Sequence, residues 1–238
     1  MSSLKSRVCD KIEASNETNA YLYHCGRKLL RLLLVRHGTT ENNIKQQMTG
    51  QSDVPLSELG KRQARAVGKY LAQEKLDVIF SSDLQRARDT AREIARYHHL
   101  PVLEDPDLRE IRMGEWEGLT VEEIMARDLE VWKYVRRDPA RHAPPGGETF
   151  SQLRERAARA LQRCQEQYAG KTVLWTTHGG LIGAAVCHAL QLDLMYRHCF
   201  RHENTSITEL RFGEGLPLIE RLNDIAHLRV LQGVALAS

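Results

Sequence analysis

The sequence has no hydrophobic run that could cross a membrane. The best candidate, Leu29–Val35, is interrupted by Arg31 and falls well short of the roughly 18 residues that a membrane helix needs. Residues 1–28 turn polar and acidic after Lys5 and Arg7, so they also lack the apolar core of a signal peptide. We therefore predict a cytoplasmic protein with no membrane partner. Residues 1–28 are an N-terminal extension of unknown role, and a loosely ordered arm or an early start codon explains them better than a targeting function.

Excess charge and paired cysteines are also missing. The formal net charge is only +3, and the basic residues are scattered, which argues against nucleic acid as a partner. The five cysteines are odd in number and widely spaced, without a CxxC or mixed Cys/His ligand spacing. This pattern favours a reducing compartment and no structural zinc. The remaining composition, 42% hydrophobic and 27% charged, is that of an ordinary globular protein.

Short apolar runs alternate with helical patterns along the chain. We expect strands at 29–35, 78–81, 102–103 and 172–177, helices at about 58–74, 84–97, 120–134, 149–168 and 179–190, and a hairpin of 206–212 with 216–222. This order predicts an α/β fold. Specifically, we expect a three-layer α/β/α sandwich whose sheet is mostly parallel with an antiparallel edge.

Chemically active side chains follow the expected strands. Arg36 and His37 come directly after the first strand, His178 follows the strand 172–177, and Arg86 lies one turn beyond the strand 78–81. Ligands of such sheets bind at the carboxyl ends of the strands, so these residues are expected to form one site. Gly38 is expected to allow the sharp turn and close backbone approach that a phosphate site needs.

Histidine and arginine in this arrangement point to phosphoryl transfer. A neutral imidazole such as His37 can attack phosphorus and form a phosphohistidine, which water then hydrolyses. Arginines pair bidentately with phosphate oxygens, and their charge also keeps a neighbouring imidazole unprotonated. An acid must protonate the departing alcohol, and we assign that role to Glu110, with Glu115 and Glu117 as nearby alternatives.

Six motifs in this order resemble the histidine phosphatase superfamily, in particular its phosphoglycerate-mutase-like branch of broad-specificity and α-ribazole phosphatases. They are Leu34–Asn43, Pro55–Gly60, Ser81–Ala91, Glu110–Gly118, Gly146–Thr149 and Thr177–Gly180. The tail Leu222–Leu228 is similar to that of the same phosphatases.

The resemblance implies a phosphoglycerate-mutase-like domain over residues 29–230 with a lid segment at about 112–147. It implies that His37 is the phosphorylated nucleophile, that Arg36, Arg86 and His178 hold the phosphate, and that Glu110 is the proton donor. It further suggests that Asn43, Thr49, Gly50 and Gly179 line the pocket, and that no metal or cofactor is needed. The expected partner is a small phosphomonoester, and a homodimer is compatible with the sequence.

Three functions are compatible with these motifs. The first is a metal-independent phosphomonoester hydrolase, and the second is a cofactor-dependent phosphoglycerate mutase with the same core residues. Met113–Gly118 resembles the corresponding segment of the phosphatases. The adjacent pair Arg136 and Arg137 is compatible with a mutase, although we favour a solvated helix end for this pair. The third, a non-catalytic phosphate-binding or interaction module, is disfavoured by the intact set of five central residues.

Overall fold

The computed structural model describes residues 29–232 and contains one six-stranded sheet. The strands are β1 (Leu30–Arg36), β2 (Val78–Ser81), β3 (Val102–Glu104), β4 (Thr172–Thr177), β5 (Ile207–Phe212) and β6 (Leu218–Asp224). Their order across the sheet is β3-β2-β4-β1-β5-β6. The first four strands run parallel, while β5 is antiparallel to β1 and pairs with β6. The predicted parallel sheet with an antiparallel edge is confirmed.

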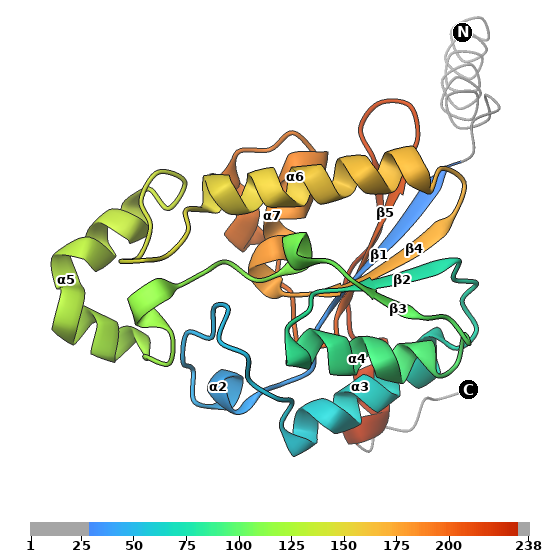
Figure 1. Cartoon of the computed structure of the whole chain (residues 1–238), viewed down its shortest axis with the longest axis horizontal. Helices are drawn as coiled ribbons and strands as arrows, with labels where there is room; N and C mark the ends of the chain where they lie inside the picture. The colour runs from blue at the N-terminus through green and yellow to red at the C-terminus, as the bar shows by residue number, and fades with distance from the viewer. Residues whose placement is uncertain (1–28, 233–238) are drawn as a thin grey trace, which may run out of the picture.

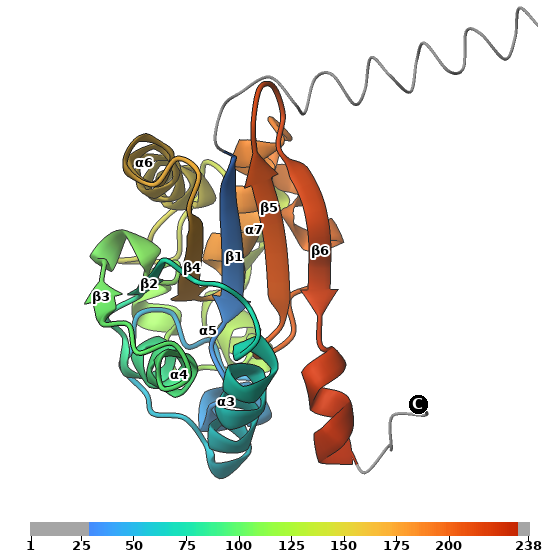
Figure 2. The same cartoon turned by 90° about the vertical axis from the view of Figure 1, so that its right-hand side faces the viewer.

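Helices cover both faces of this sheet (Figures 1 and 2). One face is covered by α3 (Glu58–Leu71), α4 (Gln85–Ala95) and the C-terminal 3-10 helix η4 (Ala226–Gln232), and the other by α6 (Phe150–Gln167) and α7 (Gly179–Ala189). The central strand β1 shows why two faces are needed. Leu32 and Leu34 pack into the core beneath α6 and α7, whereas Leu33 and Val35 pack into the core beneath α3 and α4. Alternate residues of a strand point to opposite faces, so this continuous apolar run requires both layers.

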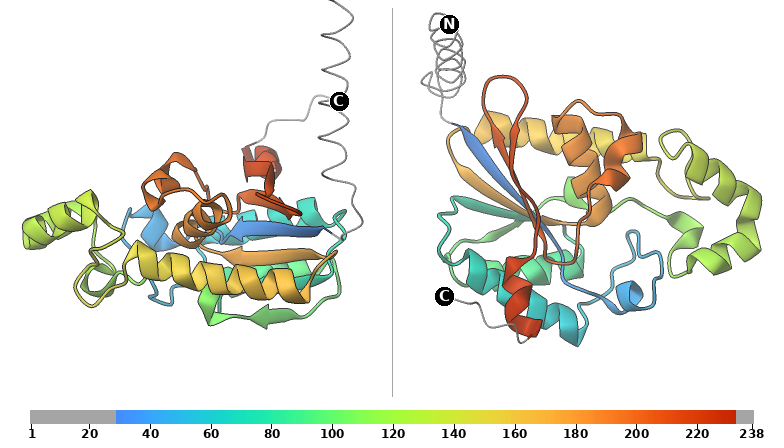
Figure 3. Two further views of the ribbon diagram at one scale, coloured as in Figure 1. Left: turned by 90° about the horizontal axis from the view of Figure 1, so that it is seen from above. Right: turned by 180° about the vertical axis from the view of Figure 1, so that it is seen from behind.

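The segment between β3 and α6 departs from this compact arrangement. It contains two short 3-10 helices, η1 (Pro106–Leu108) and η2 (Gly114–Trp116), followed by α5 (Val121–Arg137). Figures 1 and 3 show α5 projecting away from the sheet and its two helical layers. Ile124 is the only fully buried side chain of α5. Two further short helices, α2 (Glu41–Ile44) and η3 (Leu194–Cys199), lie in the loops near the carboxyl ends of the parallel strands.

The expected elements agree closely with the observed ones. The strands 78–81 and 172–177 have the predicted bounds, and the other strands and helices differ by a few residues at their ends. The expectations for residues 1–28 lie outside the described residues, as do Cys9 and Cys25. Among residues 29–232, no helix is both long and apolar enough to span a membrane.

Candidate active site

The register of two parallel strands brings the two histidines together. Arg36 at the end of β1 is paired with Thr177 at the end of β4, and each strand is followed directly by a histidine. The ring centroids of His37 and His178 are 5.0 Å apart. The His37 amide donates to the Thr177 carbonyl oxygen at 2.9 Å, which fixes the backbone at this point. Both side chains are buried.

Hydrogen bonds define the protonation state of His37. Its Nδ1 lies 2.7 Å from the Gly38 carbonyl oxygen, which can only accept, so Nδ1 carries the proton. The other nitrogen, Nε2, accepts from Nε of Arg86 at 3.3 Å. Burial lowers the pKa of His37 well below its usual value, and the charges of Arg86 and Arg36 lower it further. His37 is therefore a neutral imidazole whose Nε2 lone pair is directed at a guanidinium.

Arg86 is held without a carboxylate partner. Its side chain is completely buried in the first turn of α4, and its two terminal nitrogens donate to the carbonyl oxygens of Ser52 and Gly50 at 2.8 and 2.7 Å. Burial lowers the pKa of Arg86 to about 10. Among residues 29–232, neither Arg86 nor Arg36 forms an ion pair with a carboxylate. The positive charge of both side chains thus remains available for an anion.

Gly38 is needed for close backbone approach, which is one of the two reasons that the sequence predicts. Its φ is not positive, and a Cβ at this position would lie 2.6 Å from the Gly60 carbonyl oxygen of α3. The Gly38 amide also donates to Thr90 of α4 at 3.1 Å. Gly38 therefore lets the loop after His37 pack closely against two helices, and a left-handed backbone conformation is not what makes glycine necessary here.

Among the predicted site residues, three buried polar atoms lack a hydrogen-bond partner within residues 29–232. They are Nε of Arg36, Nδ1 of His178 and Oγ1 of Thr49. The other nitrogen of His178 lies 2.9 Å from the Ser82 hydroxyl, and Nη1 of Arg36 donates to the His202 carbonyl oxygen at 2.6 Å. Because a buried polar atom without a partner destabilises the fold, such a group of atoms indicates a polar ligand.

The three carboxylates considered as the proton donor, those of Glu110, Glu115 and Glu117, differ in their contacts and exposure. Glu110 accepts hydrogen bonds from the amides of Ile111 and Gly180, at 2.9 and 3.0 Å, and its charge acts on Arg36 and Arg86. Glu117 instead accepts from the amides of Gln51 and Met113, and so ties two loops together. The Glu115 side chain is 70% exposed. Of the three, only Glu110 is placed against Arg36, Arg86 and α7.

The remaining predicted pocket residues are placed as follows. Asn43 caps α2 by accepting from the Thr40 amide, and its side chain also accepts from Asn204. Gly50 is buried with φ +53, and a Cβ there would collide with the Glu117 carboxylate. A Cβ at Gly179 would lie 3.5 Å from Nε of Arg36, so this first residue of α7 borders the arginine.

The sequence does not reveal several residues that support the site. Asn204 donates to the His37 carbonyl oxygen at 2.9 Å, and the Thr205 amide, with φ +60, donates to that of Arg36 at 3.0 Å. His227 from η4 contacts the Thr205 hydroxyl at 3.0 Å. Of the supporting residues, only Ser82, which follows the strand 78–81, carried a positional signal. Asn204 and Thr205 lie in a loop without a pattern, whereas His227 of η4 falls within the tail Leu222–Leu228 that resembles the phosphatases of the family.

No group of three or more His, Cys, Asp or Glu side chains within the described part of the chain could hold a metal ion. Nε2 of His37 faces the Arg86 guanidinium, and Nε2 of His178 faces the Ser82 hydroxyl. The donor set around His37 is cationic, which suits an anion such as phosphate.

Known proteins are similar to this chain in both sequence and fold. The model of the histidine phosphatase superfamily, branch 1, matches residues 32–225. Phosphoserine phosphatase 1 of Hydrogenobacter thermophilus is 33% identical over 200 residues, which cover 84% of this chain and 95% of that protein. A Yersinia enterocolitica protein named "Probable phosphoglycerate mutase GpmB" is 34% identical over 205 residues, with 84% and 95% covered. The structure of the α-ribazole phosphatase from Shigella flexneri superposes with a TM-score of 0.76 at 27% identity, over 82% of this chain and 96% of that one. The chain belongs to the histidine phosphatase superfamily, branch 1.

Proposed function

We propose that this protein is a metal-independent phosphomonoester hydrolase that acts on a small phosphorylated metabolite through a phosphohistidine at Nε2 of His37. The observation that carries this proposal is the environment of that nitrogen. It is unprotonated, it faces the Arg86 guanidinium, and it lies among buried polar atoms that have no partner within the described residues. The superfamily to which the chain belongs supports the same chemistry.

The first step transfers the phosphoryl group from the alcohol to His37. Nε2 attacks phosphorus while the bond to the alcohol oxygen breaks, and the protonated Glu110 carboxyl gives its proton to that oxygen. Arg36, Arg86 and His178 bind the three equatorial oxygens, on which the transition-state charge is spread. Burial strengthens these interactions because little water competes with them.

The second step releases phosphate. A water molecule, deprotonated by the Glu110 carboxylate, attacks phosphorus, and the bond from phosphorus to Nε2 breaks. Inorganic phosphate leaves, Nε2 recovers its lone pair, and Glu110 is again protonated. Asn43, Thr49, Gly50 and Gly179 are proposed to line the phosphate pocket.

A phosphoglycerate mutase is the second candidate, because one relative at 34% identity carries that name. A mutase would return the phosphoryl group to an alcohol. The arginine pair that favours this function, Arg136 and Arg137, lies exposed in the last turn of α5. This position supports the hydrolase over the mutase, because a substrate anion held there would remain in water.

Trapping the phosphoenzyme tests the nucleophile directly. With p-nitrophenyl phosphate and a metal chelator, the protein should release nitrophenol, and acid-labile phosphate should be recovered on His37 after rapid quenching. His37→Asn should lower kcat by roughly four to six orders of magnitude. His99→Asn, at an exposed position after α4 and outside the proposed lid, is the matched control. Full activity of His37→Asn would refute the proposal, and bisphosphate-dependent interconversion of phosphoglycerates would establish the mutase instead.

We further propose that the protein works in the cytoplasm as an independent enzyme without nucleic-acid or membrane partners. The lid is assigned to residues 112–147. Fractionation of cells and measurement of the mass in solution, which would also reveal a homodimer, test these assignments.

A further inference from the structure

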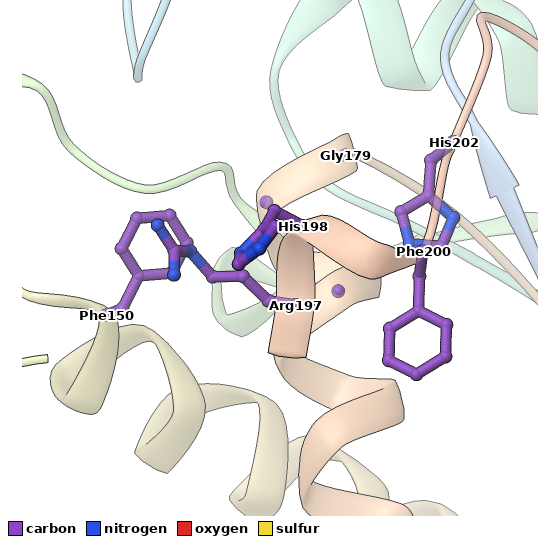
Figure 4. Close-up of a pocket in the computed structure, with 8 residues that line it drawn as sticks. Phe150, Gly179, Arg197, His198, Phe200 and His202 are labelled. Atoms are coloured by element: carbon purple, nitrogen blue, oxygen red, sulfur yellow. The ribbon is translucent and has the colours of Figure 1, made fainter. Parts of the chain in front are cut away.

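A cavity of about 260 Å³ lies alongside the first turns of α7. Three glycines of this helix, Gly179, Gly180 and Gly183, form its floor. Figure 4 shows Phe150 and Arg197 on one side and Phe200 and His202 on the other. The cavity is comparable to the smaller ligand pockets of proteins, and its walls are mostly apolar.

The cavity begins where the departing alcohol must be. The leaving oxygen has to lie next to the acid that protonates it, and the Glu110 carboxylate accepts a hydrogen bond from the Gly180 amide at 3.0 Å. Gly180 itself lines the cavity. An alcohol released beside Glu110 therefore borders on this space, while Arg36, which is proposed to hold the phosphate, lies 3.5 Å from the Cβ position of Gly179 at the edge of the cavity.

Arg197 gives the cavity a positive charge without a compensating carboxylate. Its guanidinium stacks on the Phe150 ring at 4.1 Å and donates one hydrogen bond, to the Leu194 carbonyl oxygen at 3.1 Å. Arg197 takes part in no ion pair within residues 29–232, and none of the residues that line the cavity is acidic. A stacked, half-buried guanidinium is preorganised to bind a planar carboxylate.

His202 adds a second polar group. Both of its ring nitrogens are buried without a hydrogen-bond partner, and one lies 3.9 Å from the Cβ position of Gly183. Burial and the charge of Arg36 lower the pKa of His202 to about 4, so the ring is neutral and offers one donor and one acceptor. The cavity thus offers one guanidinium, the neutral imidazole of His202 and the exposed imidazole of His198, whereas the proposed phosphate site has two arginines.

We infer that this cavity is the leaving-group subsite of the enzyme and that it selects phosphomonoesters whose alcohol carries a carboxylate. Arg197 binds the carboxylate, His202 bonds to a neighbouring polar group of the alcohol, and the two phenylalanines enclose its carbon atoms. The inference rests on the proposed phosphatase function and deepens it, because it assigns the substrate class of the same site.

Matched substrate pairs test the role of Arg197. Phosphoserine and phosphoethanolamine differ by one carboxylate, as do 3-phosphoglycerate and glycerol 3-phosphate. The wild-type protein should prefer the first member of each pair, and Arg197→Gln should lower the ratio of kcat/KM within each pair by roughly 10- to 100-fold. Arg96→Gln, an exposed arginine at the end of α4, is the matched control and should leave the ratios unchanged.

Filling the cavity tests its location independently. A Cβ at Gly183 would meet its nearest neighbour, the Arg197 carbonyl oxygen, at 3.5 Å, so a side chain can start there without a collision. Gly183→Leu should keep its folded structure, checked by thermal unfolding, and lose about tenfold or more in kcat/KM for phosphoserine.

The outcomes separate the two proposals. If the wild-type protein hydrolyses none of these esters nor p-nitrophenyl phosphate, both proposals fall. If it hydrolyses them but the ratios are the same in Arg197→Gln as in the wild type, the phosphatase function stands and the subsite assignment is wrong. Unchanged kcat/KM in a folded Gly183→Leu protein would also overturn it.

Discussion

The carboxyl end of the sheet and the α5 arm are built in opposite ways. At the sheet, Arg86 and His178 are completely buried, and each is fixed by a neighbouring strand or loop. On α5, Met125, Leu129 and Tyr134 are each more than 40% exposed, although all are apolar or aromatic. The chemistry of phosphate is the same for every phosphomonoester, whereas the alcohol differs. In the proposed reaction the buried end holds the constant phosphate, and the differing alcohol lies in the cavity beside α7, to which α5 contributes no residue.

The strongest test of this contrast is Glu110, which lies where the two regions meet. Glu110→Gln removes the proton for the leaving oxygen, so kcat for an alkyl phosphate such as phosphoserine should fall by roughly 10²- to 10⁴-fold. p-Nitrophenolate leaves without protonation, and its release should fall much less. Steady-state rates on both esters measure the difference. An equal loss on both would mean that Glu110 serves the phosphate and has no role as the acid.

An effect of intermediate size is expected on the pH dependence of stability, through the buried histidines at the carboxyl end of the sheet. The pKa values of His37 and His178 are lowered in the folded state, mainly by burial, so below pH 6.5 the unfolded chain binds more protons than the folded one. The free energy of unfolding should therefore fall as the pH is lowered from 6.5, by about 1.4 kcal/mol per pH unit for each histidine.

Urea unfolding between pH 7 and 5 measures this slope. In His37→Asn the slope should be shallower by about one proton, because one of the buried neutral histidines is gone. Identical slopes in the variant and the wild type would show that His37 does not stay neutral in the folded protein.

The smallest effect on activity is expected from a substitution in α5. Asp128 interrupts the helical geometry of α5 with φ −131 and ψ 41, and it accepts a hydrogen bond from the indole of the buried Trp116 at 2.8 Å. Asp128→Ala leaves this indole without its partner, so the free energy of unfolding should fall by about 1 to 2 kcal/mol. Hydrolysis of p-nitrophenyl phosphate should change less than about threefold, in line with a surface feature distant from the chemistry. A loss comparable to that of Glu110→Gln would abolish the distinction between the two regions.

The sequence predicts the carboxyl end of the sheet better than the arm. Apolar runs such as 172–177 specify buried strands, and the rule for ligand sites in parallel sheets then brings His37, His178 and Arg86 together. The interruption of α5 at Asp128 cannot be predicted from the sequence pattern, because it depends on the hydrogen bond that Asp128 accepts from Trp116, which lies outside α5. The same holds for Arg197 and Phe150, which lie far apart in the sequence and meet only through the packing of α6 against α7.

The position of β1 between β4 and β5 also affects how the protein is made. The strand that leads to His37 leaves the ribosome well before its partners do, since Arg31 pairs with Thr172 and with Arg211. At typical synthesis speeds of roughly 5 to 20 residues per second, this apolar segment waits on the order of ten seconds for its first neighbour. During that time its unpaired edges are open to wrong pairing, and it is a natural binding segment for a chaperone.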